Sequence, residues 1–140
     1  MKRHQVIFAA LAIAALLIAC VASFAYQQKF VLRVNAGDPK PYTDKAGNVW
    51  QPDKTYGKGA KYGFDEGDIV DRGTDVKIAG TNDPRIYQTE HYSMTKFTAE
   101  VPNGKYTVRL HFAETYDNID VDGPRVFNVK IEGKDALKKL

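Results

Sequence analysis

Side chains able to hold a ligand are concentrated in one short segment, Tyr87–Tyr92. Two tyrosines there frame Gln88, Thr89, Glu90 and His91. An aromatic ring packs on the apolar C–H face of a sugar, while amides, carboxylates and phenols bond its hydroxyl rim. On the loop that we expect here, this composition favours recognition of a sugar over bond-breaking chemistry.

Groups that could support catalysis or metal binding lack the necessary arrangement. The acidic residues that could pair as in a glycosidase are Glu114, Asp117, Asp120 and Asp122. They share one expected loop, whereas catalytic carboxylates must face each other across a cleft. Residues 118–123 resemble the start of a calcium loop, but the twelfth position holds Val129 instead of Glu. We therefore expect no catalytic residue, no metal and no cofactor.

Alternating apolar and polar residues predict three β-strand runs in the second half of the chain. The runs cover residues 97–101, 106–112 and 127–131. Asn103-Gly104 is a strong hairpin signal between the first two runs. Such alternation is typical of antiparallel sheets with one buried face, so we expect an all-β sandwich. Residues 40–85 are rich in Gly, Pro, Asp and Asn, which predicts long loops with short strands.

The first residues have the composition of an export signal. Lys2 and Arg3 precede an uncharged apolar run, Val6–Ala19, and small residues follow it. A positive start, an apolar run and small residues are typical of a secretory signal. We expect a signal peptide or membrane-anchor helix at residues 1–25, one domain at residues 26–140, and a location outside the cytoplasm.

Three fates of this N-terminal segment stay open. Leu17-Ile18-Ala19-Cys20 resembles a bacterial lipobox, in which the cysteine is lipidated and acyl chains anchor the protein by about 0.8 kcal/mol per CH₂. Ser23-Phe24-Ala25 is similar to a cleavage site that would release a soluble protein. Val6–Ala25 is also long enough to span a bilayer uncleaved. Cys20 is thus a candidate lipidation site, and the membrane is an expected partner through a lipid or a helix.

The charge balance argues against nucleic acid as a partner. The chain has 20 Lys and Arg against 17 Asp and Glu, and two of the basic residues, Lys2 and Arg3, belong to the signal. The remaining charges of both signs are interspersed, whereas a phosphate-binding surface needs clustered Lys and Arg. Cys20 is the only cysteine, so the domain that follows contains no disulfide.

Four segments together resemble the malectin domain. They are Val34-Asn35-Ala36-Gly37, Tyr87–Tyr92, Tyr106–Tyr116 with Phe112-Ala113-Glu114 inside it, and Arg125–Val129. The resemblance covers roughly residues 30 to 140. It implies a jelly-roll-like, galactose-binding-like β-sandwich that binds carbohydrate, and in the best-known members α-linked glucose disaccharides. It also implies further strands beyond Ile131, so the domain is expected to be incomplete at its C-terminus.

The resemblance implies a set of sugar-contacting residues as well. The candidate carbohydrate-binding residues are Tyr62, Gln88, Glu90, Tyr92, Tyr116 and Asp117. The tyrosines would stack on or bond the sugar from loops, and the other residues would bond its hydroxyls. Asp117 stands where animal members of the family have an aromatic residue, so the specificity for α-glucosides is an open point.

The predicted function is a non-catalytic extracytoplasmic carbohydrate-binding module, lipid-anchored in a bacterial cell envelope or secreted, with an oligosaccharide or glycan as ligand. A cell-envelope protein-interaction or structural module is one alternative, because the fold alone does not decide function. The detached binding part of a glycoside hydrolase is another. Binding to a protein that free sugar cannot displace would favour the first alternative, and a neighbouring coding sequence for a catalytic domain would favour the second.

Overall fold

The computed structural model describes residues 29–117, 119 and 125–140. The backbone divides into two compact units, residues 1–32 and 33–140. Of the first unit only residues 29–32 are described, and they form no regular element. The predicted signal and Cys20 lie outside the described residues, so the boundary after residue 25 stays a prediction. No helix within the described residues is long and apolar enough to cross a membrane.

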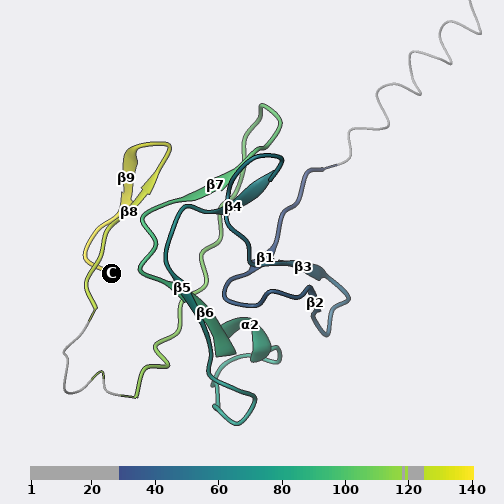
Figure 1. The fold of residues 1–140 in the computed structure, drawn as a ribbon, viewed down its shortest axis with the longest axis vertical. Helices are drawn as coiled ribbons and strands as arrows, with labels where there is room; N and C mark the ends of the chain where they lie inside the picture. The colour runs from purple at the N-terminus through teal and green to yellow at the C-terminus, as the bar shows by residue number, and fades with distance from the viewer. Residues whose placement is uncertain (1–28, 118, 120–124) are drawn as a thin grey trace, which may run out of the picture. The chain divides into compact units, whose positions relative to one another are not determined.

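The described residues form mostly short strands, with one four-residue helix, α2 at Arg85–Gln88 (Figure 1). The strands are β1 (Val34–Asn35), β2 (Tyr42–Thr43), β3 (Val49–Pro52), β4 (Tyr62–Phe64), β5 (Asp68–Asp71), β6 (Thr89–Tyr92), β7 (Phe97–Ala99), β8 (Val129–Ile131) and β9 (Lys134–Leu137). In these residues they build small sheets in the orders β1-β3-β2, β4-β7, β5-β6 and β8-β9. The all-β class is thereby confirmed, while the jelly-roll sandwich stays a prediction.

The turn between β2 and β3 is organised by one carboxylate. Asp44 accepts hydrogen bonds from the backbone N–H groups of Ala46 and Asn48 and from Trp50 Nε1, the last at 3.0 Å. Gly47 completes the turn at a φ of 81°. The bond from Trp50, followed by those from Asn48, stabilises the charged carboxylate and lowers the pKa of Asp44 from 3.8 to about 2.

Aromatic packing between β4, β6 and β7 forms the apolar centre of the described fold. Tyr62 and Phe64 are 6% and 7% exposed. The ring of Phe64 stacks on His91 at 4.0 Å and meets Phe97 edge-on at 5.0 Å. β4 and β7 pair antiparallel with Phe64 opposite Phe97, so the sheet register and the ring contacts agree.

The predicted hairpin at Asn103-Gly104 is wrong. β7 ends at Ala99 and pairs with β4, and residues 101–116 form no strand. The non-local contact of Phe64 with Phe97 determines where β7 pairs, and a local turn signal carries no information about that contact.

The predicted loop at Tyr87–Tyr92 is also wrong. Its first two residues end α2, and the remainder is β6, which pairs antiparallel with β5 along its full length. Alternate side chains of this stretch are buried against β1 and β4, which makes a strand the favourable conformation.

Candidate functional site

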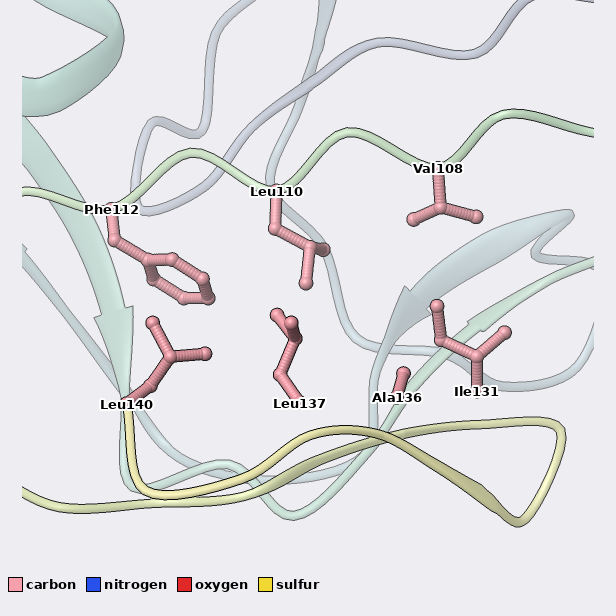
Figure 2. A pocket seen from close by; sticks show the side chains of 7 residues that line it. All are labelled: Val108, Leu110, Phe112, Ile131, Ala136, Leu137 and Leu140. Carbon is pink, nitrogen blue, oxygen red and sulfur yellow. The ribbon is translucent and has the colours of Figure 1, made fainter.

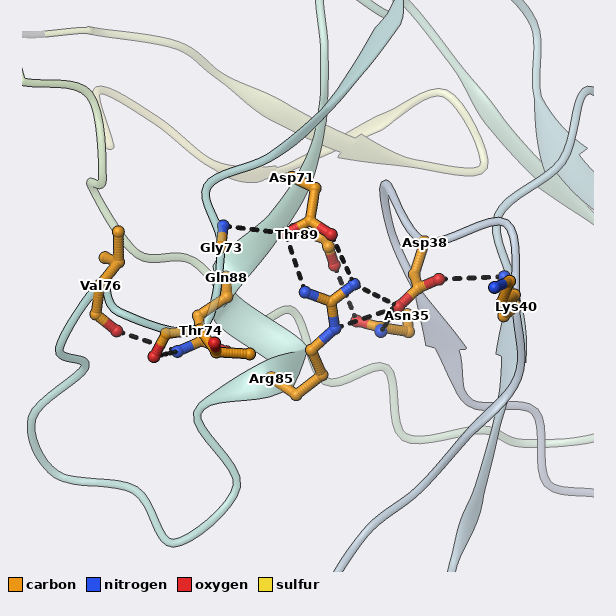
Figure 3. Close-up of polar contacts among 10 residues, drawn as sticks. All are labelled: Asn35, Asp38, Lys40, Asp71, Gly73, Thr74, Val76, Arg85, Gln88 and Thr89. Carbon is orange, nitrogen blue, oxygen red and sulfur yellow. Dashed lines mark hydrogen bonds and ion pairs between the residues drawn. The ribbon is translucent and has the colours of Figure 1, made fainter.

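A partly buried polar network fixes the point where α2 passes into β6 (Figure 3). The Arg85 guanidinium donates to Asp38 Oδ2 at 2.7 and 3.1 Å and to both carboxylate oxygens of Asp71 at 2.8 and 2.9 Å. Asn35, 1% exposed, donates to Asp38 and accepts a bond from Thr89 Oγ1 at 3.3 Å. The Arg85 bonds lower the pKa of Asp71. The network holds the start of β6 against β1 and β5.

Successive side chains of β6 lie on opposite faces of its sheet. His91 faces the interior, with Nδ1 2.9 Å from Asp53 Oδ2 and the ring stacked on Phe64. Because successive side chains of a strand point to opposite faces, Glu90 and Tyr92 share the other side. Two of the predicted sugar-binding residues are therefore presented on one face of β6.

Charged groups gather around Glu90 in what we term the arginine–tyrosine cluster: Arg72, Glu90, Glu114, Tyr116 and Arg125. Arg72 Nη2 donates to Glu90 Oε1, and its guanidinium lies 5.8 Å from the centre of the Tyr116 ring. The Arg125 guanidinium lies 5.2 Å from that ring, 3.9 Å from Glu90 Oε2 and 3.6 Å from Glu114 Oε1. Both arginines thus connect Glu90 with Tyr116, and both are within cation–π range of the ring.

The cluster has hydrogen-bonding capacity to spare. Contacts of 3.6 and 3.9 Å are longer than hydrogen bonds, so the 44% exposed Arg125 side chain holds its carboxylates loosely. Arg72 Nε is buried without a hydrogen-bond partner among the described residues. The same is true of Oγ1 of Thr115, the residue before Tyr116 in the chain. Buried polar atoms are normally bonded. The buried atoms are out of reach of a ligand, so the half-exposed Arg125 guanidinium beside the Tyr116 ring is the donor that a polyhydroxylated ligand could use.

Tyr62 and Gln88 are not on the loops where they were expected. Tyr62 is a buried residue of β4, its hydroxyl donates to the carbonyl of Pro52 at 2.9 Å, and Lys54 Nζ lies 4.0 Å above its ring. Gln88 is 3% exposed, and its amide donates to two backbone carbonyls within residues 74–76. Both side chains are already bonded within the fold, and a sugar-binding role for either stays a prediction.

Tyr92 and Asp117 are at the surface. Tyr92 ends β6 opposite Asp68 and is 41% exposed. Asp117 is exposed in the turn directly after Tyr116. Among the described residues no hydrogen bond, ion pair or ring interaction joins either side chain to the arginine–tyrosine cluster, so only Glu90 and Tyr116 of the predicted set are brought together there.

Sequence reasoning missed both arginines of the cluster. Arg72 follows β5 in a stretch expected to be loop, and nothing in its local sequence distinguishes it from other surface arginines. Arg125 lies in a segment that carries the family resemblance, but its approach to Glu90 spans 35 positions and depends on tertiary structure. An excess of unpaired acidic residues near Glu90 would have been the only sequence signal for them.

A second aromatic group joins α2, β3 and the segment after residue 106. The hydroxyl of Tyr87 lies 2.8 Å from His111 Nδ1, and the ring of Trp50 meets His111 edge-on at 5.4 Å. Burial, and then the charge of Arg109, lowers the pKa of His111. A neutral imidazole can accept a hydrogen bond from the Tyr87 hydroxyl at Nδ1, so this side-chain contact holds the segment around His111 against α2.

The described residues form a small β-rich fold in which arginines, glutamates and a tyrosine ring meet. A family model for the malectin domain matches residues 30–140, and the chain belongs to the malectin domain family. Malectin is a carbohydrate-binding domain and typically non-catalytic, which suggests a glycan or oligosaccharide as ligand. Comparisons with curated proteins and with solved structures gave no significant match. Within the described residues no group of three or more His, Cys, Asp or Glu is placed to hold a metal.

Proposed function

We propose that this chain is an extracytoplasmic carbohydrate-binding module, and that it holds an oligosaccharide at the arginine–tyrosine cluster. The Tyr116 ring contributes an apolar surface for a sugar ring. Arg125 donates to hydroxyls, and Glu90 and Glu114 accept from them. Tyr92 and Asp117, which are exposed, are further candidates for contact with the sugar.

One observation carries this proposal: two arginines bring Glu90 and Tyr116 together. These two residues lie in the separate segments Tyr87–Tyr92 and Tyr106–Tyr116 that resemble the malectin domain. A purely structural ion pair would not require an aromatic ring beside it or a half-exposed guanidinium. The balance of two arginines and two glutamates favours a neutral sugar, with an α-glucoside as the first candidate.

The sandwich fold, the lack of catalysis, the export and the lipid anchor in this proposal rest on the sequence. In this proposal the small sheets are parts of a jelly-roll sandwich. The carboxylates bind sugar hydroxyls and do not cleave glycosidic bonds. The charge, the apolar run and Cys20 support export and lipid anchoring. Mass spectrometry of the membrane-extracted wild type should find acyl chains on Cys20 that a Cys20→Ala variant lacks, and an unacylated wild type would contradict lipid anchoring.

A calorimetric titration of the full chain tests the proposal. Maltose and nigerose are the ligands and cellobiose is the β-linked control, in a detergent without a sugar head group so that the detergent does not compete. Saturable heat with an α-linked disaccharide is expected. Arg125→Ala should weaken binding about tenfold or more, since bonds to charged groups contribute about 1.5–3 kcal/mol.

The matched control is Lys58→Ala, which removes an exposed cation in a loop outside the cluster. Its affinity should equal that of the wild type. Saturable binding that Arg125→Ala leaves unchanged would move the sugar away from the cluster, and no heat with any ligand of a wider glycan panel would refute carbohydrate binding.

A further inference from the structure

The segment Thr107–Phe112 has the sequence of a β-strand but no strand partner among the residues that the structure describes. Its residues alternate apolar and polar, and no backbone hydrogen bond joins it to any other described residue. A side-chain contact, between His111 and Tyr87, holds it on its polar side. Backbone N–H and C=O groups of an extended segment are a template for pairing with another strand.

The apolar side of this segment borders a groove of about 420 Å³. Val108, Leu110 and Phe112 line one wall, and Ile131, Ala136, Leu137 and Leu140 line the other. Figure 2 shows the two sets of side chains pointing toward each other across the groove. The second wall belongs to the β8–β9 hairpin, whose pairing continues through two backbone hydrogen bonds between Phe127 and Leu140.

These wall residues remain substantially exposed. Val108, Leu110 and Phe112 are 54%, 43% and 51% exposed, and Leu137 and Leu140 are 44% and 43% exposed. Contiguous exposed apolar surface of this kind marks an interaction site. Three alternate residues of a strand span about 13 Å at about 3.3 Å per residue, so a strand of five residues would match the wall from Val108 to Phe112.

The charges around the groove have one dominant sign. The two chain segments that carry the wall residues, 104–112 and 129–140, contain six Lys and Arg and two Asp and Glu. A second copy of this chain would bring the same positive excess against it. Complementarity therefore favours an acidic occupant over self-association.

We propose that the groove is a strand-acceptor site for a polypeptide segment that alternates apolar and acidic residues. The incoming strand pairs with the backbone of Thr107–Phe112 and places its apolar side chains in the groove, as in β-augmentation. Its acidic side chains face the basic rims. The free backbone distinguishes this occupant from a lipid or a small apolar ligand, neither of which satisfies a row of N–H and C=O groups.

Fluorescence anisotropy with the full chain tests this site. The probe is a fluorescein-labelled heptapeptide, Glu-Val-Glu-Val-Glu-Val-Glu, and saturable binding is expected. The same peptide with N-methyl groups on alternate residues lacks donors on one edge, and Lys-Val-Lys-Val-Lys-Val-Lys reverses the charge. Each change should weaken binding about tenfold or more, because pairing and charge are both required.

Variants of the chain locate the binding. Leu110→Glu should weaken probe binding about tenfold or more by placing a charge in the groove. Val49→Glu, at an equally exposed position on β3, is the matched control and should bind like the wild type. Hydrogen exchange at residues 107–112 should slow on adding the probe, which is a readout that does not depend on the variants folding.

The following results would overturn the proposal. Equal binding of the N-methylated peptide would show apolar capture without strand pairing. Absence of saturation, or unchanged exchange at residues 107–112 under saturation, would remove the site. Concentration-dependent dimers that Leu110→Glu dissolves would assign the groove to a second copy. Maltose should not displace the probe, because the arginine–tyrosine cluster is a different set of residues.

Discussion

Arg72 and Arg125 both contact Glu90, but their exposure separates their roles. The Arg72 side chain is 22% exposed and donates a close hydrogen bond, while Arg125 is 44% exposed at 3.9 Å. A half-exposed pair without a hydrogen bond contributes little to stability. Arg72 is therefore the structural member of the cluster, and Arg125 is the member available to a ligand.

Substitution of each arginine should separate these roles. We expect Arg72→Ala to lower the free energy of unfolding by about 2 kcal/mol, somewhat below the about 3–5 kcal/mol of a fully buried broken pair. Arg125→Ala should change it by less than about 0.5 kcal/mol. Urea denaturation measures both values. Equal losses in the two variants would contradict the assignment.

Two carboxylates should make the fold sensitive to acid. The Trp50 bond to Asp44 and the Thr95 bond to Asp65, with further bonds, lower both pKa values from 3.8 to about 2. The pKa of each carboxyl is lower in the folded state than in the unfolded state. The ionised carboxylates therefore stabilise the fold above about pH 4, and this stabilisation is lost as the pH falls through about 2. Tm of the wild type should fall more steeply between these values than Tm of an Asp44→Asn, Asp65→Asn variant. Parallel curves would show that these bonds do not act through ionisation.

The sequence pointed to two members of the arginine–tyrosine cluster, but it did not predict which residues bring them together. Glu90 and Tyr116 were predicted from family-like segments, and the structure brings them together. The burial of Tyr62 was missed because a Gly- and Lys-rich neighbourhood resembles a loop, whereas its partners, Phe97 and the Pro52 carbonyl, come from other strands. Arg72 could be found only once β5 and β6 were paired, and Arg125 only from the tertiary approach of its segment to Glu90.

At the scale of elements, the turn after β1 is packed directly against β6. Gly37 has a φ of 83°, and a Cβ built there would lie 2.5 Å from the backbone nitrogen of Glu90. No side chain fits without moving β6. The Val34-Asn35-Ala36-Gly37 segment therefore requires glycine at its last position in order to bring β1 and β6 together.

Two glycine substitutions test this contact. Gly47 has nearly the same φ, 81°, but nothing lies within 4 Å of a Cβ built there. Gly47→Ala should lower the free energy of unfolding only by the strain of a left-handed alanine, about 1–2 kcal/mol. Gly37→Ala should lower the free energy of unfolding by clearly more, or prevent folding, because the strain of the left-handed backbone adds to the displacement of β6. Thermal melts of the two variants give the comparison, and similar Tm values would contradict a close approach of the turn to β6.

The elements predicted best from sequence are those with local causes. The β-rich class followed from alternating residues, and β3 follows the short apolar run at Val49-Trp50. The hairpin at Asn103-Gly104 failed because Phe97 packs on Phe64 and draws β7 to β4. The run at 106–112 was predicted as a strand from its periodicity, but it forms no strand, because the pattern carries no information about a pairing partner.

On the scale of the whole molecule, polar networks position much of the described fold. Tyr62 and Phe64 are its buried apolar side chains, while Asn35, Asp38, Gln88 and Thr89 are its buried polar ones. Many large apolar side chains remain exposed, including those of the strand-acceptor groove. The described part of the chain therefore has apolar surface left to bury on binding.

Occupying the groove should raise the stability of the whole chain. A ligand that binds only the folded state stabilises it, by about 2.7 kcal/mol at a hundred times Kd. We expect Tm to rise with the Glu-Val heptapeptide and to stay constant with its Lys-Val counterpart. Differential scanning calorimetry of the full chain measures both, and an unchanged Tm at saturating Glu-Val peptide would contradict strand acceptance.

The most direct test of carbohydrate binding at the arginine–tyrosine cluster is a calorimetric titration of Tyr116→Ala beside Tyr106→Ala. Both variants remove one tyrosine ring from the same segment, and only Tyr116 lies beside the two arginines. We predict that Tyr116→Ala weakens α-linked disaccharide binding about fivefold or more while Tyr106→Ala retains wild-type affinity. Equal affinities of Tyr116→Ala and the wild type, with both folded, would contradict this site.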